Sequence, residues 1–198
     1  MKTTKFSVRD MTLIAMFSAL VAVGAFIRIP IPPAPFTLQV TMTTLAGLIL
    51  GKRNGALSVI LYVAIGLLGV PIFTKGGGIG YVLEPTFGYF IGFAIGAYVT
   101  GAISHAKENP SFKRILCASL TGLLISYVCG MVYAYVLCNF VLNTPIAISF
   151  VLVYYFLIFL PKDVVLCVLT SLICKKIIPI LDKNFNIGYN RKGIKDAN

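Results

Sequence analysis

The chain has 198 residues, of which 58% are hydrophobic, and its formal net charge is +11 at pH 7. Its mean hydropathy is +0.92, and 12% of its residues are charged, where roughly 25% is usual in a soluble domain. This composition excludes a water-soluble domain and predicts an integral membrane protein. The basic residues lie between apolar runs, which indicates membrane topology and argues against a nucleic-acid-binding surface.

Six apolar stretches predict an all-α fold of six transmembrane helices in a single membrane domain over residues 1–198. Prolines at positions 30, 32, 33 and 35 predict an extended segment after the first span. A tight turn is expected at 51–55, and the glycine-rich loop at 76–80 is either a plain loop or a flexible lid over a site. The expected spans are residues 11–29, 36–50, 56–73, 86–103, 115–142 and 161–178.

The apolar stretch from residue 146 to residue 178 is too long for one span and slightly short for two. Basic residues flank both ends of the chain, so the positive-inside rule places both termini in the cytoplasm and requires an even number of spans. Residues 146–160 are therefore expected at the outer surface, and the sixth span is expected to start at Pro161. This topology puts fourteen of the seventeen Lys and Arg residues on the cytoplasmic side and leaves Arg28, Lys75 and Lys162 outside.

The outer side, which carries few charges, is where a ligand site is expected. A carboxylate at a helix centre in the membrane costs roughly 2.5–3.5 kcal/mol, so Asp163 either binds a ligand or stabilises the start of the sixth span. The cations Arg28, Lys75 and Lys162 are either interfacial side chains or partners for an anionic group such as a carboxylate. Glu84 either pairs with one of these cations or accepts a hydrogen bond from a ligand.

Aromatic residues gather at the outer ends of the third and fourth spans, where they form either an interfacial belt or the wall of a pocket for a small, partly apolar ligand. They are Phe73, Tyr81, Phe87, Tyr89 and Phe90.

Small residues lie along one side of the first span. At four-residue spacing, Ala15 and Ala19 either pack inside the bundle or form a docking face for another membrane subunit. The sequence contains no Ser/His/Asp set, no metal-binding cluster and no pair of facing carboxylates, so neither enzyme activity nor a cofactor is expected.

Five short stretches carry a resemblance to a known family. In chain order they are IPIPPAPFTLQ at 29–39, GLLGVPIF at 66–73, GGGIG at 76–80, PTFGYFIGF at 85–93 and LPKD at 160–163. With this order and spacing the chain resembles the BioY family, the biotin-specific substrate-capture (S) components of energy-coupling factor transporters. The resemblance covers nearly the whole chain.

The resemblance implies a six-helix protein of the cell membrane that captures biotin near the outer face. Its partners would be one transmembrane coupling subunit of the EcfT type and two cytoplasmic ATPases. Asp163 would hydrogen-bond the ureido ring of biotin, and Ala15 and Ala19 would form the docking motif on the first helix. Further substrate-binding candidates within the matching stretches are Gln39, Thr86 and Tyr89.

The chain departs from the family in places that bear on binding. The family commonly has Gly where Lys162 stands and Lys where Leu166 stands, and Glu84 replaces an expected small residue. The cation for the biotin carboxylate is therefore open between Lys162, Lys75 and Arg28. Two alternative functions also stay open: an S component for a different vitamin, and a membrane scaffold that binds no ligand.

Overall fold

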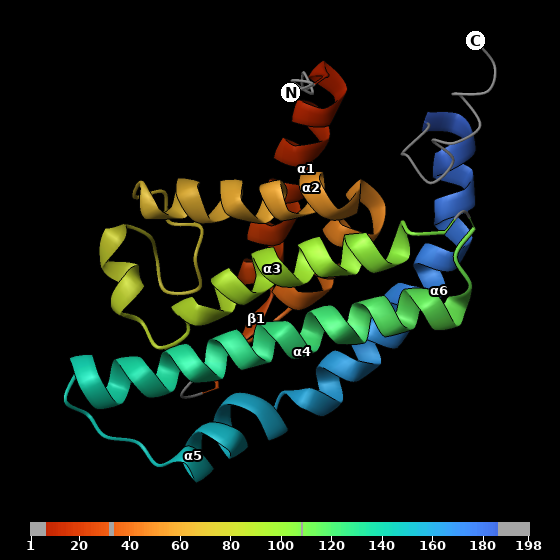
Figure 1. Cartoon of the computed structure of the whole chain (residues 1–198). Coiled ribbons are helices and arrows are strands. Elements are labelled where there is room, and N and C mark those ends of the chain that lie inside the picture. The colour runs from red at the N-terminus through yellow and green to blue at the C-terminus, as the bar shows by residue number, and fades with distance from the viewer. Residues whose placement is uncertain (1–6, 32–33, 108, 186–198) are drawn as a thin grey trace, which may run out of the picture.

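The structure is a computed structural model that describes residues 7–31, 34–107 and 109–185, and it is almost entirely helical (Figure 1). The expected all-α class is accurate apart from a short ribbon of two strands, β1 (Arg28–Ile29) and β2 (Phe36–Thr37). The long helices are α1 (Val8–Phe26), α2 (Gln39–Leu67), α3 (Phe87–Ser104), α4 (Phe112–Val136) and α6 (Leu160–Phe185). The shorter helical elements are the 3-10 helix η1 (Ile79–Leu83), the helix α5 (Ile148–Leu152) and the π-helical turns η2 (Leu137–Val141) and η3 (Val153–Leu157).

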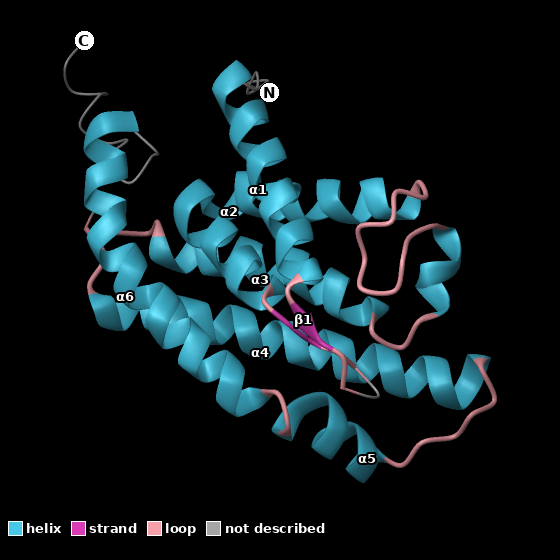
Figure 2. Cartoon of the chain, turned by 180° about the vertical axis from the view of Figure 1, so that it is seen from behind, coloured by secondary structure: helices cyan, strands magenta, loops and turns pink. Residues whose placement is uncertain are grey.

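The segment between α1 and α2 is extended on both sides of its prolines, two of which, at 32 and 33, lie outside the described residues. Strands β1 and β2 pair antiparallel, with Arg28 opposite Thr37 (Figure 2). Because the ribbon occupies both flanks, α1 ends before the predicted boundary at residue 29 and α2 begins after the predicted boundary at residue 36.

Helix α2 consists of two helical arms that fold back on each other at Gly51. This residue has φ 78° and ψ 180°, a non-helical conformation that glycine adopts without a steric penalty. The Gln39 side-chain amide donates to the Tyr62 hydroxyl at 3.0 Å, although the two residues would be about 35 Å apart along a straight helix. The helix resumes immediately after Gly51, so the predicted turn at 51–55 contracts to a single residue.

Five helical segments in the described part of the chain are long and apolar enough to cross a membrane: Val8–Phe26, Gln39–Leu67, Phe87–Ser104, Phe112–Val141 and Ile148–Lys183. Because Gln39–Leu67 is folded in two, these segments are compatible with six crossings, and the number of crossings stays a prediction. The second arm of α2 ends at residue 67 and not at the predicted 73. Gly69 there has φ 106°, and Pro71 has no backbone N–H to continue the helix.

The apolar stretch that includes residues 146–160 is divided from α6 by a turn at residues 158 and 159. Figures 1 and 2 both show α5 set at an angle to α6. Helix α6 starts at Leu160, one residue before the predicted start, and Asp163 lies in its first turn. The separation of this stretch into two parts agrees with the sequence interpretation, whereas its placement at the outer surface stays a prediction.

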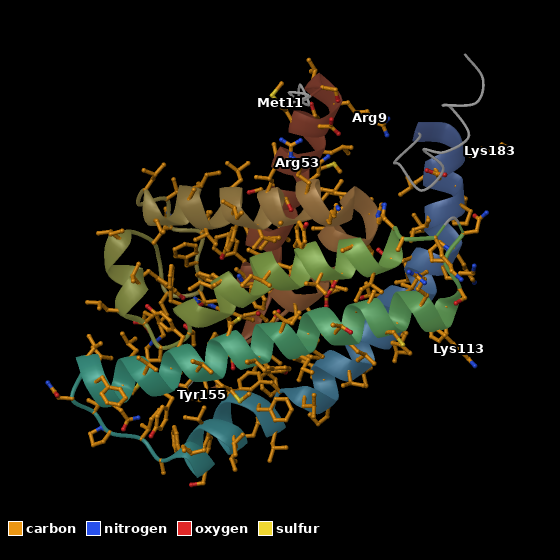
Figure 3. The ribbon with its side chains drawn as sticks, viewed as in Figure 1. Arg9, Met11, Arg53, Lys113, Tyr155 and Lys183 are labelled. Carbon is orange, nitrogen blue, oxygen red and sulfur yellow. The ribbon has the colours of Figure 1, made fainter. Side chains whose placement is uncertain are left out.

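Basic residues gather at one end of the helix bundle. At this end the Asn54 amide donates to Asp10 of α1 at 3.0 Å, and the Lys175 ammonium of α6 donates to the Pro110 carbonyl between α3 and α4 at 3.0 Å. Figure 3 labels four cations on the upper and right side of the view: Arg9, Arg53, Lys113 and Lys183. Five further cations of the same predicted group, Lys2, Lys5, Arg191, Lys192 and Lys195, lie outside the described residues.

Glycines bring α2, α3 and α4 into close contact, and the replacement of one of them tests this packing. In a Gly47→Ala variant the new Cβ would lie 2.5 Å from the Ala97 carbonyl oxygen of α3, so the two backbones must move apart. We expect the free energy of unfolding in detergent to fall by about 1–3 kcal/mol, measured by thermal denaturation. The matched control is Gly80→Ala, whose Cβ meets nothing within 4 Å. A Gly47→Ala variant as stable as this control would contradict the close packing of α2 on α3.

Candidate binding site

A cavity with about 610 Å³ of empty space, its open mouth included, lies at the end of the bundle opposite the basic residues. It lies between two aromatic clusters. One cluster contains Phe73, which follows α2, Tyr81 of η1 and Phe90 of α3. The other contains Tyr127 of α4 and Phe159, which precedes α6. The polar and charged residues that line it are Thr37, Gln39, Thr74, Thr86, Ser126, Lys162 and Asp163, with the tyrosines Tyr81, Tyr89 and Tyr127.

Asp163 is the most buried charged group of the cavity, with 2% of its surface exposed. The hydroxyl of Tyr127 donates to its Oδ2 atom at 2.6 Å. Its Oδ1 atom lies 2.7 Å from the Lys162 ammonium as an ion pair, yet no hydrogen bond of good geometry from a described residue reaches this atom. The ion pair lowers the cost of the buried charge, while Oδ1 keeps a lone pair that an additional donor can use.

Lys162 connects α6 with the ribbon. Its ammonium donates to the Thr37 carbonyl of β2 at 2.9 Å and lies 5.4 Å from the centre of the Phe36 ring. An ammonium has three N–H donors, so Lys162 can contact the Asp163 carboxylate and donate to the Thr37 carbonyl at the same time. The side chain is 26% exposed, so the group faces the cavity and is not fully enclosed.

The wall formed by α2, η1 and the loop between them carries neutral polar groups, and we call it the neutral wall. Gln39 donates to Tyr62, whose own hydroxyl donates to the Ile72 carbonyl at 3.2 Å. The hydroxyls of Thr74 and Tyr81 lie 2.8 Å apart, and both residues are buried. These bonds hold the side chains of this wall in fixed positions without any charge.

Aromatic rings also line the cavity, beside the neutral wall and beside the charged wall, which is formed by Lys162 and Asp163. Tyr89 of α3 contacts both clusters, and its ring centre lies 6.1 Å from that of Tyr127. Its hydroxyl donates to the Tyr155 carbonyl in η3, which connects α3 with the segment before α6. Phe90 and Phe93 complete the apolar lining on α3. The cavity is therefore suited to a small ligand with an apolar body and polar groups at its ends.

The structure brings five of the eight predicted substrate-binding residues to the cavity: Gln39, Thr86, Tyr89, Lys162 and Asp163. Arg28 is exposed in β1 and does not line it. Lys75 and Glu84 also lie outside the lining and form an ion pair of 2.6 Å with each other. Whether each of the eight residues contacts a ligand stays a prediction.

The sequence interpretation missed the principal partner of Asp163. Tyr127 lies in the middle of an apolar run, and a tyrosine there needs a hydrogen-bond partner, which is the signal that marks it. Its pairing with a residue 36 positions away depends on the packing of α4 on α6, which no local pattern contains.

The glycine-rich loop packs closely against the end of α2 and the segment that follows it. The Gly78 N–H donates to the Gly66 carbonyl at 2.7 Å, and Phe73 exchanges backbone hydrogen bonds with Gly76. A Cβ at Gly77 would overlap the Val70 carbonyl, so this position requires glycine. Whether it acts as a plain loop or as a lid stays a prediction.

Ala15 and Ala19, the predicted docking residues, are exposed on α1.

Among the described residues, no group of three or more His, Cys, Asp or Glu side chains is placed to hold a metal ion.

Comparison with known proteins gives consistent matches over most of the chain. A sequence model of the BioY family matches residues 1–183. A protein of Lysinibacillus sphaericus named "Probable biotin transporter BioY" is 45% identical over 171 residues, which are 86% of this chain and 87% of that protein. The "Biotin transporter BioY" of Thermotoga maritima is 42% identical over 124 residues, 62% of this chain and 72% of that protein.

The fold also matches a solved structure. It is the crystal structure of the S-component for biotin from an ECF-type ABC transporter. The TM-score is 0.75 and the sequence identity is 27%, with 87% of this chain and 92% of that chain covered.

Removal of the Tyr127 hydroxyl tests the hydrogen bond on which the buried carboxylate depends. A Tyr127→Phe variant leaves Asp163 Oδ2 without its donor, so we expect the free energy of unfolding to fall by about 1–3 kcal/mol in thermal denaturation. Tyr135→Phe is the control, because its hydroxyl makes no hydrogen bond to a described residue and it packs on the same cluster. Equal stability of the two variants would contradict a requirement for the Tyr127 donor.

Proposed function

The chain belongs to the BioY family, and on this premise we propose that it is the substrate-binding membrane component of a biotin uptake transporter. It is a multi-pass protein of the cell membrane that captures biotin and delivers it with partner subunits, without chemical conversion of the substrate. The observation that carries the proposal is the cavity in which Asp163 and Lys162 lie on one wall beside a lining of aromatic rings.

The charged wall complements the ureido ring of biotin. A ureido group has N–H donors next to a carbonyl acceptor, and the adjacent Asp163 and Lys162 offer an acceptor next to a donor. The Oδ1 atom of Asp163, which lacks an aligned hydrogen bond, accepts a ureido N–H, and the Lys162 ammonium donates to the ureido oxygen. Tyr127 holds the carboxylate in place during this contact.

The aromatic lining complements the rest of the molecule. The thioether ring and the hydrocarbon chain of biotin are apolar, and sulfur atoms make favourable contacts with aromatic rings. Tyr89, Phe90 and Phe93 supply such rings between the two polar walls. A ligand of this kind requires few ionisable groups, which agrees with the small number of charges at the cavity.

We further propose six crossings with both termini in the cytoplasm and residues 146–160 at the outer surface. The folded-back arms of α2 supply the sixth crossing. The gathering of the basic residues at one end supports a cytoplasmic position for that end, by the positive-inside rule. The cavity, at the other end, then opens toward the outside.

The proposed partners are one transmembrane coupling subunit of the EcfT type and two cytoplasmic ATPases, since the sequence has no nucleotide-binding motif of its own. Ala15 and Ala19 are exposed on α1, and small side chains allow another helix to approach closely. These two residues are the proposed docking contact.

A scaffold that binds no ligand has no need for a buried ion pair at a cavity. An S component for another vitamin would share the fold, and it differs from the present proposal in the ligand that is bound.

Calorimetry on the purified protein in detergent tests the proposal. We expect tight binding of biotin with a stoichiometry near one to one, and no binding of thiamine or riboflavin. A folded protein that binds none of the three would remove the transport assignment, and binding of another vitamin would replace biotin as the ligand.

The same measurement tests the role of Asp163. Asp163→Asn loses a charge-assisted acceptor, so we expect the affinity for biotin to fall by roughly 10- to 150-fold. Glu84→Gln is the matched control, because Glu84 lies outside the cavity lining, and its affinity is expected to stay within about twofold. Unchanged affinity in Asp163→Asn would remove this residue from the site.

Bulky substitutions on α1 test the docking contact. In a variant with Ala15→Leu and Ala19→Leu we expect loss of co-purification with the coupling subunit and of uptake into reconstituted vesicles, with biotin binding unchanged. Met16→Leu is the control, since this exposed neighbour keeps nearly the same volume. Normal assembly of the double variant would exclude these alanines as the docking face.

A further inference from the structure

The Lys162–Asp163 ion pair of the cavity can contact only one end of a biotin molecule. The Lys162 ammonium is 2.7 Å from the Asp163 carboxylate, so a group that contacts one of them lies beside the other. The ureido ring and the carboxylate of biotin are separated by the thioether ring and the hydrocarbon chain. With the ureido ring at Asp163, as the proposed function requires, Lys162 is engaged there and is not available to the carboxylate.

The two remaining cations at this end of the molecule are not placed to replace it. Arg28 is exposed in β1 and lies outside the cavity lining. Lys75 is also outside the lining, and its charge is balanced by Glu84 at 2.6 Å. No described cation other than Lys162 lines the cavity.

Three hydroxyl-bearing residues that line the cavity, which we call the hydroxyl trio, are the remaining candidates for the carboxylate end. They are Thr74, Tyr81 and Thr86. Thr74 and Tyr81 are 6% and 5% exposed, and their hydroxyls are 2.8 Å apart. In such a pair one hydroxyl donates to the other, and the second keeps its hydrogen for a ligand.

Thr86 has a free hydroxyl. It is the residue before α3, but its side chain makes no capping hydrogen bond and no hydrogen bond to another described residue. The hydroxyl trio therefore offers hydrogen-bond donors to an oxygen atom in the cavity without any positive charge.

We infer that the hydroxyl trio holds the carboxyl end of biotin and that the site consequently also binds neutral carboxyl derivatives of biotin, such as its primary amide and its methyl ester. This inference rests on the proposed function. Hydroxyl groups donate to the carbonyl oxygen of an amide or an ester as well as to a carboxylate, with a moderate loss of strength for the neutral acceptor. A buried cation would discriminate strongly, because the amide would leave its charge unpaired.

Calorimetric competition with the full chain in detergent tests the inference, with biotin and its primary amide as probes. We expect the amide to bind about tenfold more weakly than biotin. An amide more than about thirtyfold weaker overturns the inference, because recognition by a cation costs on the order of 100-fold or more. Absence of biotin binding to the wild-type chain would instead be a failure of the proposed function.

Two sets of variants locate the contact. Thr86→Val keeps the side-chain shape and removes only the hydroxyl, so we expect about a tenfold loss of affinity for both probes, and Thr86→Ser should restore it. Lys75→Gln and Arg28→Gln should leave both affinities within about twofold. A tenfold loss for biotin alone in either cation variant, or no loss for either probe in Thr86→Val, overturns the inference.

Discussion

The structure depends on how the Asp163 carboxylate is accommodated inside an apolar bundle. An isolated carboxylate in such surroundings is strongly disfavoured unless it is paired and hydrogen-bonded. Tyr127 of α4 supplies a hydroxyl, Lys162 of α6 supplies an ammonium, and the Thr37 carbonyl of β2 fixes that ammonium in turn. One buried charge thus determines how α4, α6 and the ribbon meet, and the cavity is the space that these elements leave against α2 and α3.

The helices themselves approach through small residues. Gly47 of α2 contacts the α3 backbone, and Gly92 and Gly96 of α3 contact the α4 backbone near Ser126 and Gly122. In a membrane, where apolar side chains gain little by leaving lipid, such close approach supplies much of the packing energy. Larger side chains at these positions would separate the helices and change the width of the cavity.

Sequence patterns predicted the features that depend on local composition. The apolar runs marked the helices, the prolines marked the ribbon, and Lys162 and Asp163 stood out as charges next to apolar residues. Patterns could place Arg28, Lys75 and Glu84 on the ligand side, but distance from the cavity is a tertiary property, and all three lie outside its lining. Tyr127 and the Gln39–Tyr62 hydrogen bond escaped prediction because each joins helical segments that meet only in the folded chain. The reversal at Gly51 needed one residue where composition suggested five, because a glycine with positive φ turns the backbone without a linker.

The separation of charge along the bundle has a consequence for how an anionic ligand would reach the cavity. Among the described residues, the cations Arg9, Arg53, Lys113 and Lys183 lie at the end remote from the cavity (Figure 3). At the cavity end, the described charges are Arg28, Lys75, Lys162, Glu84 and Asp163, which leave a net charge of +1. Lys183 lies 20 residues beyond Asp163 on α6, roughly 30 Å along the helix, which exceeds the Debye length of about 8 Å at physiological ionic strength, so such remote charges do little to guide a ligand inward. Encounter is then governed by diffusion and by the openness of the mouth, and its rate should depend little on salt.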